Sequence, residues 1–134
     1  MVGHTGDFTA AISAVETIDT CLARLCEAVE MANGVLVITA DHGNIEKMKD
    51  IETNQSFTAH TTNVVPLILA VAPESSPTLS IEDGRLADVA PTLLRFMGLP
   101  QPVEMTGQNL TIAVSNVASP APSSSTAKTG LMST

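Results

Sequence analysis

The segment that most constrains the fold is a stretch with the apolar spacing of a helix, followed directly by a continuous apolar run with the pattern of a strand. Apolar residues recur three and four positions apart between residues 12 and 29, which predicts a helix with one buried face. Asp7 or Thr9 can cap its N-terminus, and the Asn33-Gly34 pair suits its end. Residues 35–40 then form a β-branched run without alternation, which indicates a strand covered on both faces in a parallel sheet.

Two further elements follow the same logic. Residues 64–71 form a second apolar run, with Pro66 near its start, where a missing N–H does the least harm. Apolar residues between 86 and 97 again have helical spacing, with Asp88 as a cap and Gly98 as a stop. Helix, strand, strand and helix, with covered strands, predict the α/β class.

The last part of the chain has a different composition. Residues 112–134 are rich in Ser, Thr, Ala and Pro and show no periodicity. Such a segment buries too little apolar surface to offset the entropy lost on ordering. We therefore expect one domain over residues 1–111 and a disordered tail over residues 112–134.

Composition argues against two classes of partner. The chain carries 6 Lys and Arg against 14 Asp and Glu, and this net charge of −8 repels a phosphate backbone. With 3 Phe and neither Trp nor Tyr, it cannot build platforms on which bases stack. No apolar run is long enough to span a bilayer, and no export signal follows Met1. We expect no nucleic-acid partner, no membrane and a cytoplasmic location.

Candidate chemistry concentrates on the histidines of the chain, His4, His42 and His60. Each lies in a polar segment beside small residues, and none lies within an apolar run. Asp41 and His42 directly follow the first predicted strand, and open α/β sheets bind ligands at the carboxyl ends of their strands. Neutral imidazole and carboxylate together suit Zn²⁺ or Mn²⁺. These residues are therefore candidate metal ligands.

Other interpretations stay open on spacing alone. Any one of these histidines can be a hydrogen-bonded loop residue. Asp41 and His42 can also form a proton-transfer couple, in which the carboxylate orients the imidazole. A hydrolase triad is the weaker interpretation, because no Ser lies beside the pair to act as a nucleophile.

Four blocks of sequence carry a more specific signal: residues 1–6 (MVGHTG), 39–44 (TADHGN), 58–66 (TAHTTNVVP) and 84–92 (GRLADVAPT). In this order they resemble the cofactor-independent (2,3-bisphosphoglycerate-independent) phosphoglycerate mutases. The resemblance covers about residues 1–110 and includes residues 104–107 (EMTG) as a closing segment. The Asp-His-Gly-Asn block alone would indicate the wider alkaline-phosphatase-like superfamily, whereas the Ala-His-Thr-Thr-Asn block is more specific.

The resemblance implies a two-metal isomerase of glycolysis that interconverts 3-phosphoglycerate and 2-phosphoglycerate through a phosphoserine intermediate. It implies part of an alkaline-phosphatase-like sandwich, with parallel strands covered by helices. Carried over by position, His4 and His60 would hold one ion, and Asp41 and His42 would hold the other. The expected ion is Mn²⁺, with Mg²⁺, Co²⁺ or Zn²⁺ as alternatives. We expect the complete enzyme to be a monomer.

Several parts of the family pattern are not in this sequence. In the family, an Asp stands immediately before the Met-Val-Gly-His block, and the serine nucleophile and the substrate-binding domain lie far upstream. We therefore assign no catalytic residue and expect the isolated chain to be inactive. Two alternatives remain: a non-catalytic metal-binding module, and a fragment of another alkaline-phosphatase-superfamily enzyme, such as a phosphopentomutase or a phosphonate hydrolase.

Overall fold

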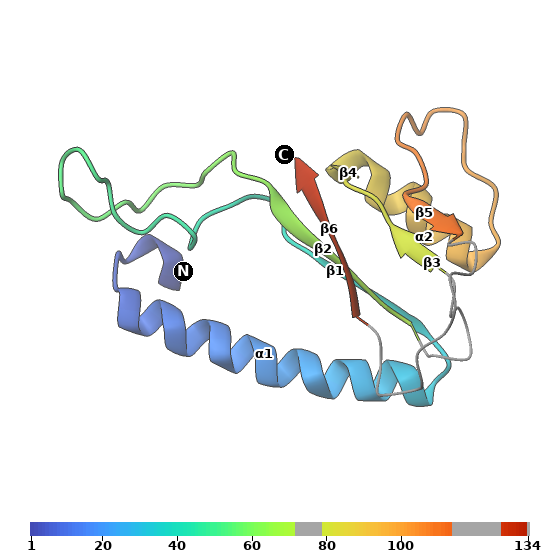
Figure 1. Ribbon diagram of the computed structural model, residues 1–134, viewed down its shortest axis with the longest axis horizontal. Coiled ribbons are helices and arrows are strands. Elements are labelled where there is room, and N and C mark those ends of the chain that lie inside the picture. Colours follow the sequence, from blue (N-terminus) through green and yellow to red (C-terminus); the bar gives the residue numbers. More distant parts are fainter. Residues whose placement is uncertain (72–78, 114–126, 134) are drawn as a thin grey trace.

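The structure is a computed structural model that describes residues 1–71, 79–113 and 127–133, and the statements below concern these residues. A long helix runs along one face of a four-stranded sheet, and a shorter helix packs against the core on the other face (Figure 1). Helices and a sheet in these layers confirm the predicted α/β class.

The N-terminal part of the chain is a single 3₁₀ turn, η1 (Val2–His4), followed by the helix α1 (Phe8–Met31). Asp7 caps this helix, and its carboxylate accepts the N–H of Ala10 at 2.9 Å. After the helix ends, Asn33 takes a φ of 51°, the left-handed conformation that asparagine tolerates. Both ends of the helix lie where the sequence predicts them. Among the described helices, none is long and apolar enough to cross a membrane.

The main sheet is built around one central strand, β2, which pairs antiparallel with β1 on one side and with β6 on the other. A short strand, β4, pairs in parallel with the far edge of β6. The order of the strands in the sheet is β1 (Val35–Thr39), β2 (Val65–Val71), β6 (Ala127–Ser133) and β4 (Gly84–Arg85).

The expectation of a parallel sheet is wrong for the two strands read from the sequence. β1 and β2 are antiparallel, with Leu36 opposite Ala70 and Ile38 opposite Ile68. A parallel pair would require the chain to cross back over the sheet before β2 begins. Residues 40–64 instead form an excursion without helix, which leaves and re-enters the sheet at the same end (Figure 1). A chain that returns at the end it left can only run antiparallel.

The structure also differs from the expected disordered tail where that tail is described. β6 forms part of the main sheet, and β5 (Thr111–Ala113) pairs with β3 (Leu79–Ile81) in a second, two-stranded sheet. Residues 114–126 and 134 lie outside the described residues. The composition of the tail did not predict β6, because this strand is stabilised by contacts with other segments. Its backbone N–H and C=O groups pair with those of β2, and Met132 is fully buried.

The second predicted helix begins with a 3₁₀ turn, η2 (Leu86–Asp88), and continues as α2 (Val89–Met97). Pro91 lies in the first turn, where its missing N–H would have had no helical partner. Gly98 ends the helix with a φ of 65°, a conformation that carries little cost for glycine. Gly98 confirms the expected stop. Asp88 stands at the N-cap position of α2, but its side chain does not cap that helix, because its carboxylate accepts the N–H of Arg85 instead.

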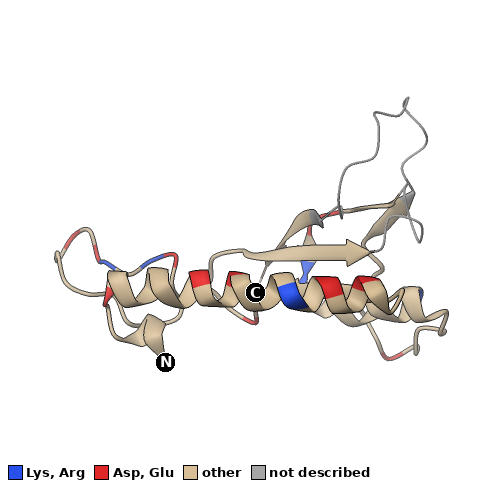
Figure 2. Cartoon of the chain, turned by 90° about the horizontal axis from the view of Figure 1, so that it is seen from below, with Lys and Arg blue, Asp and Glu red and all other residues tan. Residues whose placement is uncertain are grey.

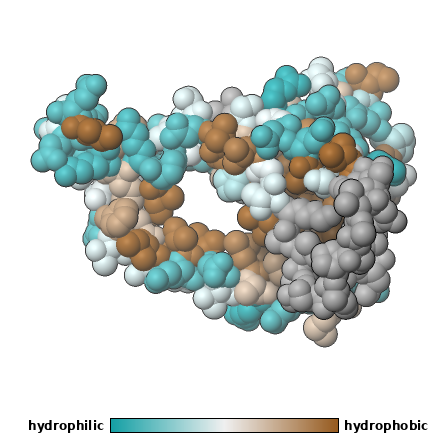
Figure 3. All heavy atoms as spheres, in the orientation of Figure 1, coloured by the Kyte–Doolittle hydropathy of each residue, from teal (hydrophilic) through white to brown (hydrophobic). Residues whose placement is uncertain are grey.

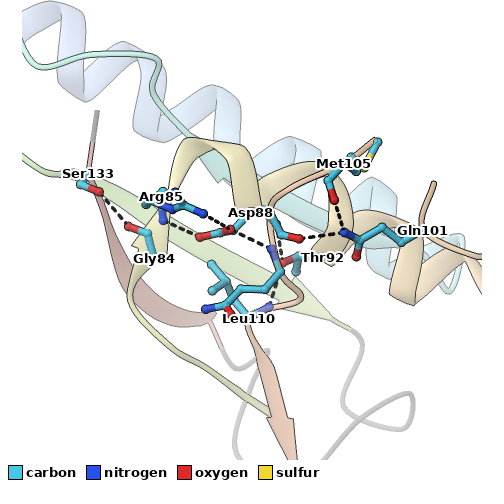
Figure 4. A network of polar contacts seen from close by, with 10 residues as sticks. Gly84, Arg85, Asp88, Thr92, Gln101, Met105, Leu110 and Ser133 are labelled. Carbon is cyan, nitrogen blue, oxygen red and sulfur yellow. Dashed lines mark hydrogen bonds and ion pairs between the residues drawn. The ribbon is translucent and has the colours of Figure 1, made fainter. Parts of the chain in front are cut away.

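Asp88 is the centre of a buried polar network that joins α2 to the closing segment (Figure 4). Its carboxylate accepts the N–H of Arg85 at 2.7 Å and the N–H of Gln108 at 2.8 Å. Its carbonyl accepts the Thr92 hydroxyl, which in turn accepts the N–H of Leu110 at 3.1 Å. Because Asp88 is only 1% exposed, its carboxylate depends on these donors in place of water.

The hydrophobic core lies between β2 and the α2 side of the molecule. Residues of β2 alternate in burial, and Leu67 and Leu69 are fully buried. Leu110 and Met132 close the core from the other segments, and Phe96 of α2 packs against it. Alternation along β2 shows that one face of this strand is covered far better than the other.

The opposite face of the sheet, toward α1, is open. Apolar side chains of α1 are exposed there, including Ile12, Val15, Ile18 and Leu25, and Figure 3 shows apolar atoms along the helix bordering an opening. Apart from Arg24, the charged residues of α1 are acidic (Figure 2). The residues of β1 are half-buried or exposed, so the expectation that β1 is covered on both faces is wrong for the described residues. α1 crosses this side of the sheet without sealing it.

Candidate metal centre

The excursion between β1 and β2 places two of the predicted histidine segments side by side. Asp41 and His42 follow the end of β1, and His60 lies on the arm that returns to β2. The arms are joined by an antiparallel bridge between Gly43 and Thr61, in which the Thr61 N–H donates to the Gly43 carbonyl at 2.8 Å. The third histidine, His4, comes from η1, just before α1.

The structure brings all of the predicted ligand side chains together. The Nε2 atoms of His4 and His60 lie 3.3 Å apart. The rings of His42 and His60 stack, with centroids 3.6 Å apart and planes inclined by 20°. Nε2 of His42 lies 3.6 Å from the Asp41 carboxylate oxygen Oδ1. Residues from three separate segments thus converge at the end of the sheet where β1 finishes.

Backbone carbonyls orient two of these rings. Nδ1 of His4 lies 2.6 Å from the carbonyl of Thr58, and Nδ1 of His42 lies 3.1 Å from the carbonyl of Gly43. A carbonyl can only accept, so each Nδ1 must carry the proton that it donates. In the neutral ring the lone pair then lies on Nε2, the atom that faces the cluster. Neutral imidazole held in this way is the form that binds metal.

The distances between the candidate donor atoms fit two pairs, each on its own ion, better than a single group on one ion. Two donors with bonds of about 2.1 Å to one tetrahedral ion are about 3.4 Å apart. The His4–His60 separation of 3.3 Å meets this value, and the Asp41–His42 separation of 3.6 Å is slightly wider. Within the described part of the chain, no three His, Cys, Asp or Glu side chains are grouped so that they could hold one ion. Each pair therefore offers two donors, and an ion would need further donors beyond them.

Asn44 packs these segments against one another. Its side-chain amide donates to the carbonyl of Ala59 at 3.3 Å, which ties the outgoing arm to the segment that precedes His60. A Cβ on Gly3 would collide with the Asn44 side-chain oxygen, so the segment that carries His4 approaches this closely only because residue 3 is glycine. Asn44 thus touches all three histidine segments.

Glu46 is a part of the site that sequence reasoning missed. Its carboxylate accepts hydrogen bonds from the hydroxyl of Thr61, the side-chain amide of Asn63 and the N–H of Asn44. Partial burial raises the pKa of Glu46, but these hydrogen bonds outweigh it, so its pKa lies below the usual value. The only signal in the sequence was an acidic residue shortly after the Asp-His-Gly-Asn block, which is too common to identify a role.

Comparisons with known proteins identify relatives of this chain. The 2,3-bisphosphoglycerate-independent phosphoglycerate mutase of Thermomicrobium roseum is 58% identical over 118 residues, which cover 86% of this chain and 22% of the relative. The proteins of the same name from Methylobacillus flagellatus and Cereibacter sphaeroides are 54% and 56% identical over 110 residues, covering 82% of this chain and 21% of each relative. This chain thus spans about a fifth of the length of the curated relatives it matches.

A family profile matches a larger continuous part of the chain than the motif blocks alone. The profile of the metalloenzyme superfamily matches residues 1–101, about three quarters of the 134 residues. The matched region includes η1, α1, β1, β2 and α2, together with the whole of the excursion that carries Asp41, His42 and His60. Because this match covers about three quarters of the chain, including the segments that carry the candidate ligands, the chain belongs to the metalloenzyme superfamily.

Proposed function

We propose that this chain supplies two pairs of metal ligands to a phosphoglycerate mutase, with His4 and His60 on one divalent ion and Asp41 and His42 on the other. The enzyme interconverts 3-phosphoglycerate and 2-phosphoglycerate through a phosphoserine intermediate. Mn²⁺ is the proposed ion, and Mg²⁺, Co²⁺ and Zn²⁺ can use the same donors. The identity of 54–58% to proteins named as this mutase supports the assignment.

One observation carries the proposal: the rings of three histidines, each from a different segment, meet at one end of the sheet. His60 lies between His4 and His42, in contact with both rings. A set of unrelated loop histidines has no reason to stack and share contacts while carbonyls hold two of their Nδ1 atoms. The hydrogen-bonded loop interpretation therefore explains each ring separately but not their convergence.

The chain's own residues have a limited task in this reaction. They bind and orient, and the rings of His4 and His42 are held so that each presents a lone pair. Two divalent ions, when bound, neutralise the charge of a transferring phosphoryl group and favour the ionised form of a serine hydroxyl. The nucleophile and the substrate-binding groups belong to other parts of the proposed enzyme. It is proposed to act as a monomer in the cytoplasm.

Metal binding is the first test, and Mn²⁺ titration followed by electron paramagnetic resonance measures it directly. Asp41→Asn and His42→Ala are expected to weaken one class of site by more than about 10- to 100-fold, the effect of removing a residue that only supports a ligand, since each change alters one of the two donors of that pair. His60→Ala should weaken the other class. Circular dichroism should show unchanged helix content in all three variants. Wild-type Mn²⁺ affinity in every variant would contradict the ligand assignment.

Activity is tested in a chimera. The matching segment of the Thermomicrobium roseum mutase is replaced by the part of this chain that aligns with it, and interconversion of the two phosphoglycerates is measured. We expect activity in the chimera and its loss on His42→Ala, because the other ion alone leaves the phosphoryl group's charge incompletely neutralised. A folded, Mn²⁺-binding but inactive chimera would instead favour a non-catalytic metal-binding module or a fragment of another enzyme of the superfamily.

A further inference from the structure

The Glu46 carboxylate spans the two arms of the excursion. Oε2 accepts the backbone N–H of Asn44 at 2.6 Å, on the arm that leaves β1. Oε1 accepts the Thr61 hydroxyl and the Asn63 side-chain amide, the latter at 3.0 Å, on the arm that returns to β2. One side chain thus joins both arms with hydrogen bonds to an ionised acceptor, which are stronger than those between neutral groups.

The donors to Glu46 are near neighbours of the proposed ligands. Asn44 lies two residues after His42, and Thr61 directly follows His60. A shift of either arm relative to the other would therefore change the separation of the stacked His42 and His60 rings. Other links between the arms near the histidines include the backbone bond from Thr61 to Gly43 and the bond from the Asn44 amide to Ala59.

Gly43 shows that space has been left for this carboxylate. A Cβ added at Gly43 would collide with both the Thr61 hydroxyl oxygen and Glu46 Oε1. Gly43 has no positive φ, so its backbone does not demand glycine. The Thr61 hydroxyl and the Glu46 carboxylate that it donates to together exclude a side chain at residue 43.

We propose that Glu46 is a positioning residue, which holds the His42 and His60 arms at the separation that the two metal sites require. It is not proposed as a ligand, because both of its oxygens already accept hydrogen bonds from the protein. The inference rests on the proposed function, since it concerns the same pairs of ligands. It predicts that the geometry of the histidine cluster depends on a residue that touches none of the histidines.

The first test needs no metal. Nuclear Overhauser contacts between the ring protons of His42 and His60 are measured in the full 134-residue chain. We expect these contacts in the wild type and in Glu52→Ala, a control that removes an exposed acid from the same excursion. They should be lost in Glu46→Ala. The methyl signals of the β2 core should stay unchanged, which separates a local opening of the arms from general unfolding.

Glu46→Gln provides an intermediate variant of nearly the same volume. Its amide oxygen can still accept from Thr61 and Asn63, but its NH₂ group would face the N–H of Asn44, and two donors cannot bond. We therefore expect weakened ring contacts, between those of the wild type and those of Glu46→Ala. This variant also keeps the test decisive if the alanine variant does not fold.

The second readout is Mn²⁺ affinity. Glu46→Ala should weaken binding about tenfold, the lower end of the effect of removing residues that support metal ligands. In double variants with His42→Ala, the loss from Glu46→Ala should disappear at the Asp41–His42 site, because there is no longer a ring to position. A purely structural contribution would instead lower affinity by the same factor in both backgrounds.

The two proposals fail in different ways. Ring contacts that persist in Glu46→Ala, or that are absent from the wild type, overturn the positioning role whatever the metal data show. Unchanged Mn²⁺ affinity in His42→Ala and His60→Ala overturns the proposed ligands. If those variants lose Mn²⁺ while Glu46→Ala keeps wild-type affinity and ring contacts, only the positioning role is wrong.

Discussion

The two polar clusters of this chain are built in opposite ways. Asp88 is buried, and backbone N–H groups from two segments donate to its carboxylate within the closed core. His4 and His60 are exposed, and their cluster is held by hydrogen bonds between loops at the end of the sheet. The first arrangement stabilises the fold, because a buried charge without donors is costly. The second leaves ring nitrogens accessible, which suits the proposed metal binding.

The same contrast divides the apolar residues. On the α2 side of the sheet, side chains such as Leu67 are fully buried, whereas on the α1 side Ile18 is 56% exposed. Stability should therefore be concentrated on the α2 side, and candidate chemistry on the α1 side. Each of the following predictions tests that division.

Asp88→Ala should have the largest effect on the free energy of unfolding. Removing the carboxylate leaves the N–H groups of Arg85 and Gln108 without their acceptor, and each buried donor left unsatisfied costs about 1–3 kcal/mol. Urea denaturation measures the loss. Glu27→Ala, which removes an exposed acid from α1, should change stability by less than about 0.5 kcal/mol. Equal effects of the two substitutions would contradict the conclusion that stability is concentrated on the α2 side.

Leu67→Ala should cause the next largest loss in the free energy of unfolding. The side chain is fully buried, and truncation removes apolar contacts and leaves a cavity, at a cost of about 2–5 kcal/mol. Ile18→Ala on the open face of α1 should cost less than about 0.5 kcal/mol, because that side chain is already largely in water. Thermal unfolding of both variants would check this pair. A costly Ile18→Ala would show that the α1 face is covered in solution.

Asp7→Ala should have an effect of about 1 kcal/mol, because it removes the side-chain acceptor for the first free N–H groups of α1. Circular dichroism should show fraying of the helix, next to the segment that carries His4. Asp7→Ser, which keeps a capping oxygen, should restore most of the loss. If Asp7→Ser is as unstable as Asp7→Ala, capping is not the reason.

The smallest expected effect is the pH dependence from Glu46. Its pKa is lowered in the folded chain: partial burial raises it, but the hydrogen bonds from Thr61 and its neighbours outweigh burial. The ionised form is therefore favoured by folding, and this stability is present above the unfolded pKa of about 4.3 and is lost as the pH falls through the folded pKa. Because Glu46 is exposed, the contribution should stay well below 1 kcal/mol.

Urea midpoints of the wild type and Glu46→Gln provide the measurement. The wild type should be slightly more stable at pH 7, and the difference should shrink as the pH falls through the lowered pKa of the folded chain and the carboxyl group becomes protonated. A difference that grows on acidification would have the wrong sign for a carboxylate whose pKa is lowered by folding.

The sequence alone was sufficient to predict the helices, because a helix is stabilised by contacts between residues that are close in the chain. Periodicity over residues 12–29, with a capping Asp7 and a left-handed Asn33, determines α1 because helix bonds and caps join residues close in the chain. The same holds for α2, between its 3₁₀ turn and Gly98. The polar segments around the histidines could also be recognised, since motif residues and their order are visible without a structure.

Tertiary structure decided how those pieces meet. The antiparallel pairing of β1 with β2 depends on where residues 40–64 return, and β6 is ordered by the backbone groups of β2. Glu46 joins its partners at positions 44, 61 and 63 because the excursion folds back on itself. Hydrogen bonds between distant segments produce no periodic pattern in the sequence of either segment. Whether a donor meets its acceptor depends on where the fold places the two segments.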